Sequence, residues 1–144
     1  MTVTIEQLWD IEQIKQLKAR YFRLLDTKDW TAFAELFTED CVHHLPQESP
    51  KPSVTNDEYL RDLEVQLGDG VTTHHGHMPE ITILSDTEAE GIWAMFDYVQ
   101  WPQDDGTSWG LKGYGHYLEE YVVEDDRWRI ARTRLERLRV DPIS

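Results

Sequence analysis

The stretch Val71–Ile83, which reads Val-Thr-Thr-His-His-Gly-His-Met-Pro-Glu-Ile-Thr-Ile, leads from three clustered histidines into alternating apolar and polar residues. Alternation predicts a β-strand, because successive side chains of a strand point to opposite faces of a sheet. The histidines, His74, His75 and His77, lie in the first half of this strand. Histidine is the side chain best suited to move protons near neutral pH. The stretch therefore predicts both a sheet and a proton-handling site at its mouth.

Upstream of this strand, apolar residues recur every three or four positions, which is typical of amphipathic helices. Thr4 and Gln7 are spaced as a capping box, so the first helix is expected to begin directly after Thr4. The expected elements are, in chain order, a helix ending near Asp26, a helix over residues 30–37, a strand over 41–45, a surface loop over 47–53 and a helix over 58–67.

After Gly70 the period of the pattern changes from 3.6 to 2. Four strands are expected, over residues 71–84, 88–101, 109–124 and 127–140. They exceed the usual strand length of about 5–6 residues, which indicates a strongly curved sheet. Helices followed by a run of strands predict an α+β fold. The chain shows no repeat and no linker, so residues 1–144 are expected to form a single domain.

Composition excludes several classes of partner. The chain carries 28 acidic and 14 basic residues, a net charge of −14, which argues against nucleic acid and anionic membranes. No apolar run approaches the length of about 20 residues that a transmembrane helix needs, and the first residues lack the pattern of a signal peptide. A cytoplasmic location is therefore expected. The single cysteine, Cys41, excludes an internal disulfide framework.

Five short segments, taken in order, carry a resemblance to a known family. They are residues 21–26 with Asp29 and Trp30, and residues 74–81, 91–98, 113–117 and 128–134. Together they resemble the SnoaL-like family of the nuclear transport factor 2-like superfamily, over essentially the whole chain. The resemblance implies N-terminal helices packed on a strongly curved mixed or antiparallel sheet, with one cone-shaped pocket. It leaves function open, because this superfamily hosts dehydratases, isomerases, cyclases, dehydrohalogenases and non-catalytic binding modules.

Within the superfamily, the pattern is most similar to the bile acid dehydratase, scytalone dehydratase and dehydrochlorinase types of lyase. These pair an Asp at the end of the first helix with a His on the first long strand, and Asp26 and His74 match. The bile acid dehydratase type has a Tyr five residues before the Asp, which is matched by Tyr21. The dehydrochlorinase type has Lys there, and an Arg that corresponds to Arg134. Tyr21 therefore favours an oxygen leaving group or a carbonyl over a halide.

The chemistry of such a trio is coherent. A carboxylate that accepts a hydrogen bond from one imidazole nitrogen fixes the tautomer, and the other nitrogen becomes a base. Tyr21 would donate a hydrogen bond to the developing oxyanion or the leaving oxygen. On an ideal helix Tyr21 and Asp26 point about 140° apart, so one cavity must wrap the helix end to receive both. The alternative is a core tyrosine and an unrelated aspartate at a helix terminus.

Five further residues are candidates for contact with a substrate. Tyr114 and His116 share one face of their strand, which meets the ligand in the resembling lyases, and His116 is a candidate second acid. His43 is a similar candidate, and for both histidines the alternative is a hydrogen-bonded interior residue. Asp97 lies among apolar residues and needs a partner, for which Arg134 or His116 is expected. Arg134 is the one residue of its arginine-rich run expected to bind an oxyanion.

The other clustered histidines are weaker candidates. His75 has the opposite parity to His74 and should face away from the site, and His75 and His77 are expected at the surface or an interface. His74 and His77 also differ in parity, and no second cysteine or carboxylate triad accompanies them, which disfavours zinc. No nucleotide, flavin or nicotinamide motif is present. Neither a metal nor an organic cofactor is expected.

These observations favour a cofactor-independent lyase, of the dehydratase type, acting on a hydrophobic cyclic or aromatic small molecule. His74 is the expected base, Asp26 orients it and Tyr21 is the oxygen donor. An isomerase or polyketide-cyclase-type enzyme with the same base is the first alternative. A non-catalytic small-molecule binding module is the second. A homo-oligomer, a dimer or trimer formed through the outer face of the sheet, is also expected.

Overall fold

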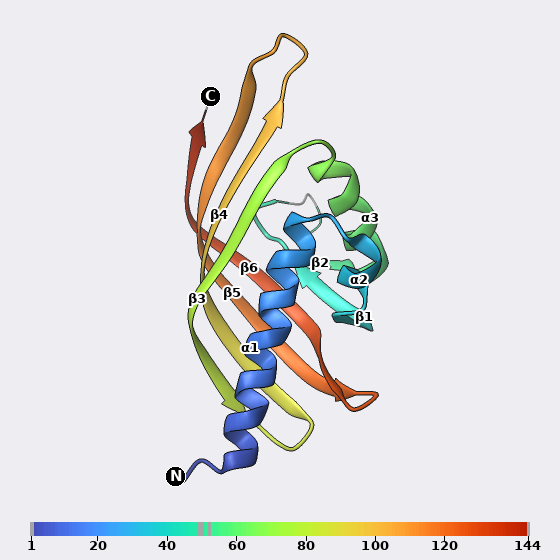
Figure 1. Cartoon of the computed structure of the whole chain (residues 1–144), viewed down its shortest axis with the longest axis vertical. Helices are drawn as coiled ribbons and strands as arrows, with labels where there is room; N and C mark the ends of the chain where they lie inside the picture. The colour runs from blue at the N-terminus through green and yellow to red at the C-terminus, as the bar shows by residue number, and fades with distance from the viewer. Residues whose placement is uncertain (1, 49–50, 52, 144) are drawn as a thin grey trace.

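The computed structural model describes residues 2–48, 51 and 53–143. Three helices lie on the inner side of a curled, open sheet (Figure 1). The helices are α1 (Ile5–Asp26), α2 (Trp30–Ala34) and α3 (Asn56–Leu67). The strands are β1 (Phe37–His44), β2 (Ser53–Thr55), β3 (Val71–Ile83), β4 (Glu88–Pro102), β5 (Ser108–Glu124) and β6 (Arg127–Ile143). The expected α+β architecture is confirmed.

The sheet has the strand order β2-β1-β6-β5-β4-β3. Strands β3 to β6 form the antiparallel meander expected from the sequence, and their bounds differ from the expected ones by three residues at most. The short strand β1 lies parallel to β6, which makes the sheet mixed. The connection from β1 to β3, which lies at the other edge of the sheet, runs through β2 and α3.

The largest boundary error of the sequence prediction lies at the start of β1, which begins at Phe37 and not at residue 41. The helix expected over residues 30–37 ends at Ala34, and Phe37 already belongs to β1. The cause is tertiary, because Phe37 pairs with Ile130 of β6 and the Ile130 N–H donates to the Leu36 carbonyl over 2.8 Å. Pairing of the backbone with another strand here overrides the local helical pattern.

Between β1 and α3, two further differences appear. The expected loop over residues 47–53 includes the start of β2, which pairs with the end of β1, while residues 49, 50 and 52 lie outside the described part of the chain. Helix α3 begins two residues earlier than expected, because the Thr55 hydroxyl caps it by accepting from the Glu58 N–H. At α1 the expected capping box between Thr4 and Gln7 is present.

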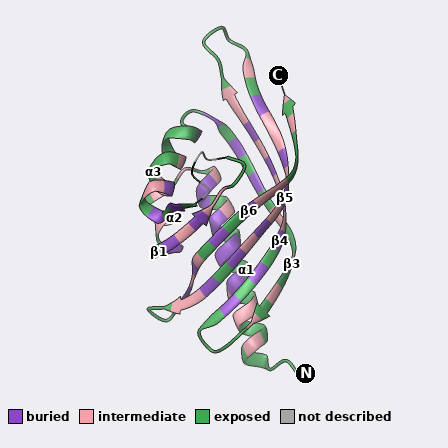
Figure 2. Cartoon of the chain, turned by 180° about the vertical axis from the view of Figure 1, so that it is seen from behind, coloured by how far each residue is buried: buried purple, intermediate pink, exposed green. Residues whose placement is uncertain are grey.

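The core lies between α1 and the concave face of the long strands (Figure 2). Burial alternates along β4 and β5, so that Trp93, Met95, Tyr117 and Tyr121 face the core. The intervening residues form the outer face. Among the helices described, none has the length and hydropathy needed to cross a membrane.

A buried ion pair connects α1 to this concave face. Lys18 Nζ lies 2.9 Å from Glu119 Oε2, and both side chains are fully buried. The ammonium also rests on the rings of Tyr21 and Tyr117, 3.7 and 3.8 Å from their centroids, which is the geometry of a cation–π contact. The Tyr121 hydroxyl donates to the other Glu119 oxygen over 2.8 Å. Burial lowers the pKa of Lys18, and the adjacent Glu119 opposes that shift.

Candidate active site

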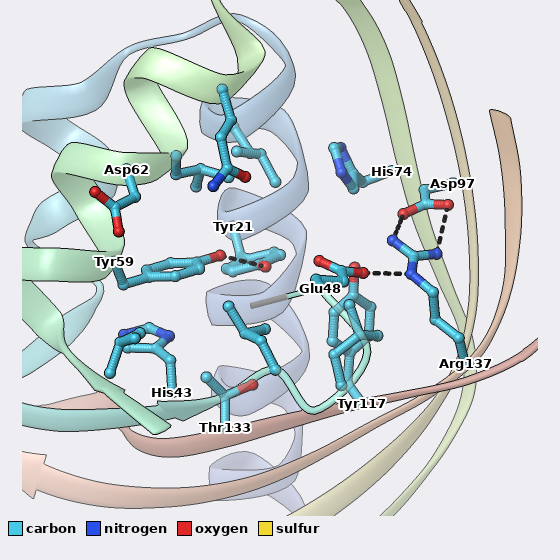
Figure 3. Close-up of a pocket in the computed structure, with 16 residues that line it drawn as sticks. Tyr21, His43, Glu48, Tyr59, Asp62, His74, Asp97, Tyr117, Thr133 and Arg137 are labelled. Carbon is cyan, nitrogen blue, oxygen red and sulfur yellow. Dashed lines mark hydrogen bonds and ion pairs between the residues drawn. The ribbon is translucent and has the colours of Figure 1, made fainter. Parts of the chain in front are cut away.

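A pocket with a volume of about 80 Å³ opens between α1, α3 and the concave face of the sheet (Figure 3). Both helices and all six strands contribute to its walls. The polar side chains that matter most for its chemistry are Tyr21, His43, Tyr59, His74, Asp97 and Arg137. Their convergence on one cavity, beside the apolar side chains of Leu25, Val54 and Leu135, makes this pocket the candidate active site.

The structure brings Asp26 and His74 into direct contact. Asp26 Oδ1 accepts from His74 Nδ1 over 2.7 Å and from the Thr72 hydroxyl over 2.9 Å. Asp26 Oδ2 accepts from the His74 backbone N–H over 2.9 Å. Three hydrogen bonds thus hold the carboxylate, and a carboxylate partner places the imidazole proton on Nδ1. Nε2 is left with its lone pair, on a side chain that lines the pocket. The catalytic role of this pair remains a prediction.

Strand parity and the end of α1 explain how this pair forms. Asp26 is the last residue of α1, and α1 packs along β3. Thr72 and His74 lie on the buried face of β3, so both reach Asp26. His75 lies on the other face, exposed and near the ring of Phe96, as parity predicts.

Two tyrosine hydroxyls meet inside the pocket. Tyr21 of α1 and Tyr59 of α3 are buried, and their hydroxyl oxygens lie 3.4 Å apart. Burial is the main cause that raises the pKa of both phenols, so both are neutral and able to donate at physiological pH. Tyr21 and Asp26 reach one site although they point apart on the helix, because His74 lies between Asp26 and the pocket. Tyr59 has only a helical apolar pattern in the sequence, which does not reveal its place in the site.

His43 is fully buried in the pocket wall. Its Nε2 lies 3.0 Å from Asn56 Oδ1, and its ring stacks on that of Tyr59 at 3.7 Å between centroids. Burial lowers the pKa of His43 to about 4, so the imidazole is neutral. Because its one N–H is given to Asn56, His43 has no proton to supply as an acid.

Neutral burial of His43 predicts a specific dependence of stability on pH. The unfolded chain binds a proton at His43 near pH 6.5, whereas the folded chain does so near pH 4. The contribution to stability is therefore fully present above about pH 6.5 and is lost as the pH falls to about 4, by at most about 3 kcal/mol. Urea titrations of the wild type and of His43→Phe give the free energy of unfolding of each at several pH values. We expect the difference, wild type minus variant, to decrease as the pH is lowered through this window. A constant difference would contradict this prediction.

Asp97 is paired with a residue other than those expected. It accepts two hydrogen bonds from Arg137, over 3.0 Å from Nη1 and 2.8 Å from Nη2, and the Glu48 carboxylate accepts from Arg137 Nε. The prediction of Arg134 or His116 as its partner is wrong. Gly113, which lies opposite Asp97 on β5, explains the difference. A Cβ atom at Gly113 would collide with both Asp97 and Arg137, so this glycine lets the arginine of β6 reach across β5.

Three other candidates lie outside the pocket. Tyr114 and His116 belong to the outer face of β5, because Gly113, Gly115 and Tyr117 occupy its concave face. Arg134 is exposed on the outer face of β6 and pairs with Glu136 over 2.6 Å. None of these three side chains lines the pocket that contains His74. Alternation along a strand shows that two faces exist, but it does not show which of them is covered by the helices.

Comparison with known proteins defines the class and then the family. The chain superposes with a TM-score of 0.85 on a protein from Novosphingobium aromaticivorans provisionally identified as a scytalone dehydratase, at 24% identity, covering 99% of this chain and 93% of the other. A hexachlorocyclohexane dehydrochlorinase, LinA type 2, gives a TM-score of 0.80 at 16% identity, with 97% and 93% covered. The fold is that of the nuclear transport factor 2-like proteins.

The sequence assigns the family within this fold. The family model of the SnoaL-like domain matches residues 6–134, and the chain belongs to the SnoaL-like family. A further similar structure is a protein of unknown function from Mycobacterium tuberculosis, with a TM-score of 0.74 at 26% identity, covering 93% of this chain and 75% of the other. The structures that resemble this chain thus include proteins named for lyase reactions, a dehydratase and a dehydrochlorinase.

Proposed function

We propose that the protein is a cofactor-independent lyase of the dehydratase type, acting on a hydrophobic cyclic or aromatic small molecule. The observation that carries this proposal is the contact between Asp26 and His74, whose second imidazole nitrogen has no hydrogen-bond partner among the described residues, on a side chain that lines the pocket. The hydroxyls of Tyr21 and Tyr59 are the matching donors in the same cavity. The lyase names of similar structures support it.

The proposed reaction begins when His74 Nε2 takes a proton from the carbon next to a carbonyl group. The electrons of the broken C–H bond move toward the carbonyl oxygen, where a tyrosine hydroxyl stabilises the developing negative charge. The same electrons then form the carbon–carbon double bond and expel the hydroxyl group from the neighbouring carbon. That hydroxyl takes the proton back from the imidazolium and departs as water, which restores the neutral base.

The charges around the pocket suit this sequence of steps. Asp26 stabilises the imidazolium that forms when His74 is protonated, because their atoms are already in hydrogen-bond contact. Arg137 is paired with Asp97 and Glu48, so its positive charge is balanced before any substrate binds. The tyrosines, kept neutral by burial, are the uncharged donors at the carbonyl.

The volume of the pocket bears on the substrate. About 80 Å³ is well below the range of about 300–1,000 Å³ common for sites that hold drug-sized ligands. A ring-sized substrate therefore requires movement of lining side chains. Leu45 and Glu48 lie in the segment between β1 and β2. They are lining residues outside the helices and strands, and moving Glu48 would break its ion pair with Arg137.

The test is a screen of cyclic β-hydroxy ketones in D₂O, followed by proton NMR. We expect loss of water, seen as new alkene signals, with the protein but not with a heat-denatured sample. An isomerase with the same base would instead move a double bond or exchange the α-proton without losing water. A binding module would shift protein signals and leave every compound unchanged, which would overturn the proposal.

A further inference from the structure

We infer that His43 is a specificity residue, whose Nδ1 accepts a hydrogen bond from a hydroxyl or N–H group that the substrate keeps during the reaction. This inference deepens the proposed function by naming a second polar group on its substrate. It concerns binding and not proton transfer, so it can fail or hold independently of the lyase chemistry.

His43 has an incomplete set of hydrogen bonds. His43 is fully buried and its Nε2 is bound to Asn56. Its Nδ1 is also inaccessible to solvent and has no hydrogen-bond partner among the described residues. Buried polar atoms in proteins are nearly always paired, because an unpaired one keeps the full cost of desolvation. A group outside the chain is therefore expected to complete this set once the pocket has widened to admit a ring-sized ligand.

The unpaired Nδ1 of His43 can act only as a hydrogen-bond acceptor. Burial keeps the imidazole neutral, so it carries one proton. Asn56 Oδ1 can only accept, which places the proton on Nε2. Nδ1 then holds a lone pair and recognises a donor. A carbonyl or ether oxygen of a ligand would meet this lone pair without a hydrogen bond.

His43 lies in the pocket wall at a distance from the proposed base. Its ring stacks on that of Tyr59, whose hydroxyl lies beside the hydroxyl of Tyr21. Figure 3 shows His43 on the opposite side of the cavity from His74. The hydroxyl that leaves must reach the protonated His74 to depart as water. The group bound by His43 is hence a different one, which stays on the product.

Phenol and toluene are matched probes for this acceptor, because they differ by a hydroxyl in place of a methyl group. We expect phenol to bind the wild type about fivefold more tightly than toluene, which corresponds to a net hydrogen bond of about 1 kcal/mol. Titrations of protein labelled with ¹⁵N-histidine supply both affinities. Phenol should also change the ¹⁵N chemical shift of His43 Nδ1, while toluene leaves it unchanged.

His43→Phe removes the acceptor and keeps an aromatic ring against Tyr59, so the preference for phenol should vanish in this variant. His44→Phe is the matched control, since His44 is the next residue and contacts Ser53 and Arg132 outside the pocket. It should keep the preference. Equal binding of both probes to the wild type, or a preference that persists in His43→Phe, would overturn the inference.

Two outcomes remain decisive if a variant is poorly folded. The shift of Nδ1 in the wild type needs no substitution, and its absence on saturation with phenol would overturn the inference alone. Preference for phenol together with no turnover in the D₂O screen would refute the lyase and leave the acceptor role of His43 intact.

Discussion

His74→Ala is expected to lower kcat of the proposed elimination by about 10²–10⁴-fold, the usual contribution of a general base. The loss follows from the geometry, since Nε2 of His74 is the free nitrogen of an imidazole whose Nδ1 is held 2.7 Å from Asp26. Asp26→Asn should cause a loss in the same range with little change in KM. An amide in that position no longer enforces the tautomer or stabilises the imidazolium.

His75→Ala is the matched control for this prediction. His75 is the neighbouring histidine, exposed on the outer face of β3, and its removal should leave kcat within about twofold, as expected for a surface residue without a catalytic contact. Urea unfolding of all three variants separates lost chemistry from lost structure. If His74→Ala and Asp26→Asn both kept full turnover on a substrate found in the screen, the pair would have no catalytic role.

Lys18→Met is expected to cost about 3–5 kcal/mol of the free energy of unfolding, the usual effect of breaking a buried ion pair. The substitution keeps most of the side-chain volume and removes the charge that faces Glu119 at 2.9 Å. Glu119 would then be a buried carboxylate whose remaining donor, within the described part of the chain, is the Tyr121 hydroxyl. Equilibrium urea denaturation at pH 7 measures this loss.

Two further variants test whether the charge is the cause. In the double variant Lys18→Met with Glu119→Gln no charge is left unpaired, so most of the lost stability should return. Lys51→Met is the matched control, because Lys51 pairs with Glu58 at the surface, 3.8 Å away, and such pairs contribute about 1 kcal/mol or less. A double variant no more stable than Lys18→Met would show that packing around Lys18, and not its charge, stabilises this region.

Much of the fold follows from local patterns. The change of period after Gly70 predicts the meander, and the capping box places the start of α1, since both depend on neighbours within a few residues. The proximity of Asp26 and His74 was indicated by family resemblance and not by physical pattern, as 48 residues separate them.

The polar contacts in and near the pocket cannot be predicted from local patterns, because they join residues that are far apart in the sequence. Arg137 reaches Asp97 across a strand because Gly113 leaves room, and no sequence spacing encodes such a crossing. Lys18 and Glu119 are both charged, and charged residues are almost never fully buried without a partner. The burial of either residue can be predicted only if its partner is known, and 101 residues separate the two in the sequence.

By itself, the sequence determined the kind and order of the elements other than the short strand β2. It also determined the alternation of faces along each strand and the set of residue types available for proton transfer. The tertiary structure alone decided which face of β5 is covered by the helices. That choice places Tyr117 and Glu119 inside and Tyr114 and His116 outside. The physical reason is that period and capping are short-range properties. Burial depends on which surfaces meet, and both faces of β5 carry aromatic and polar side chains.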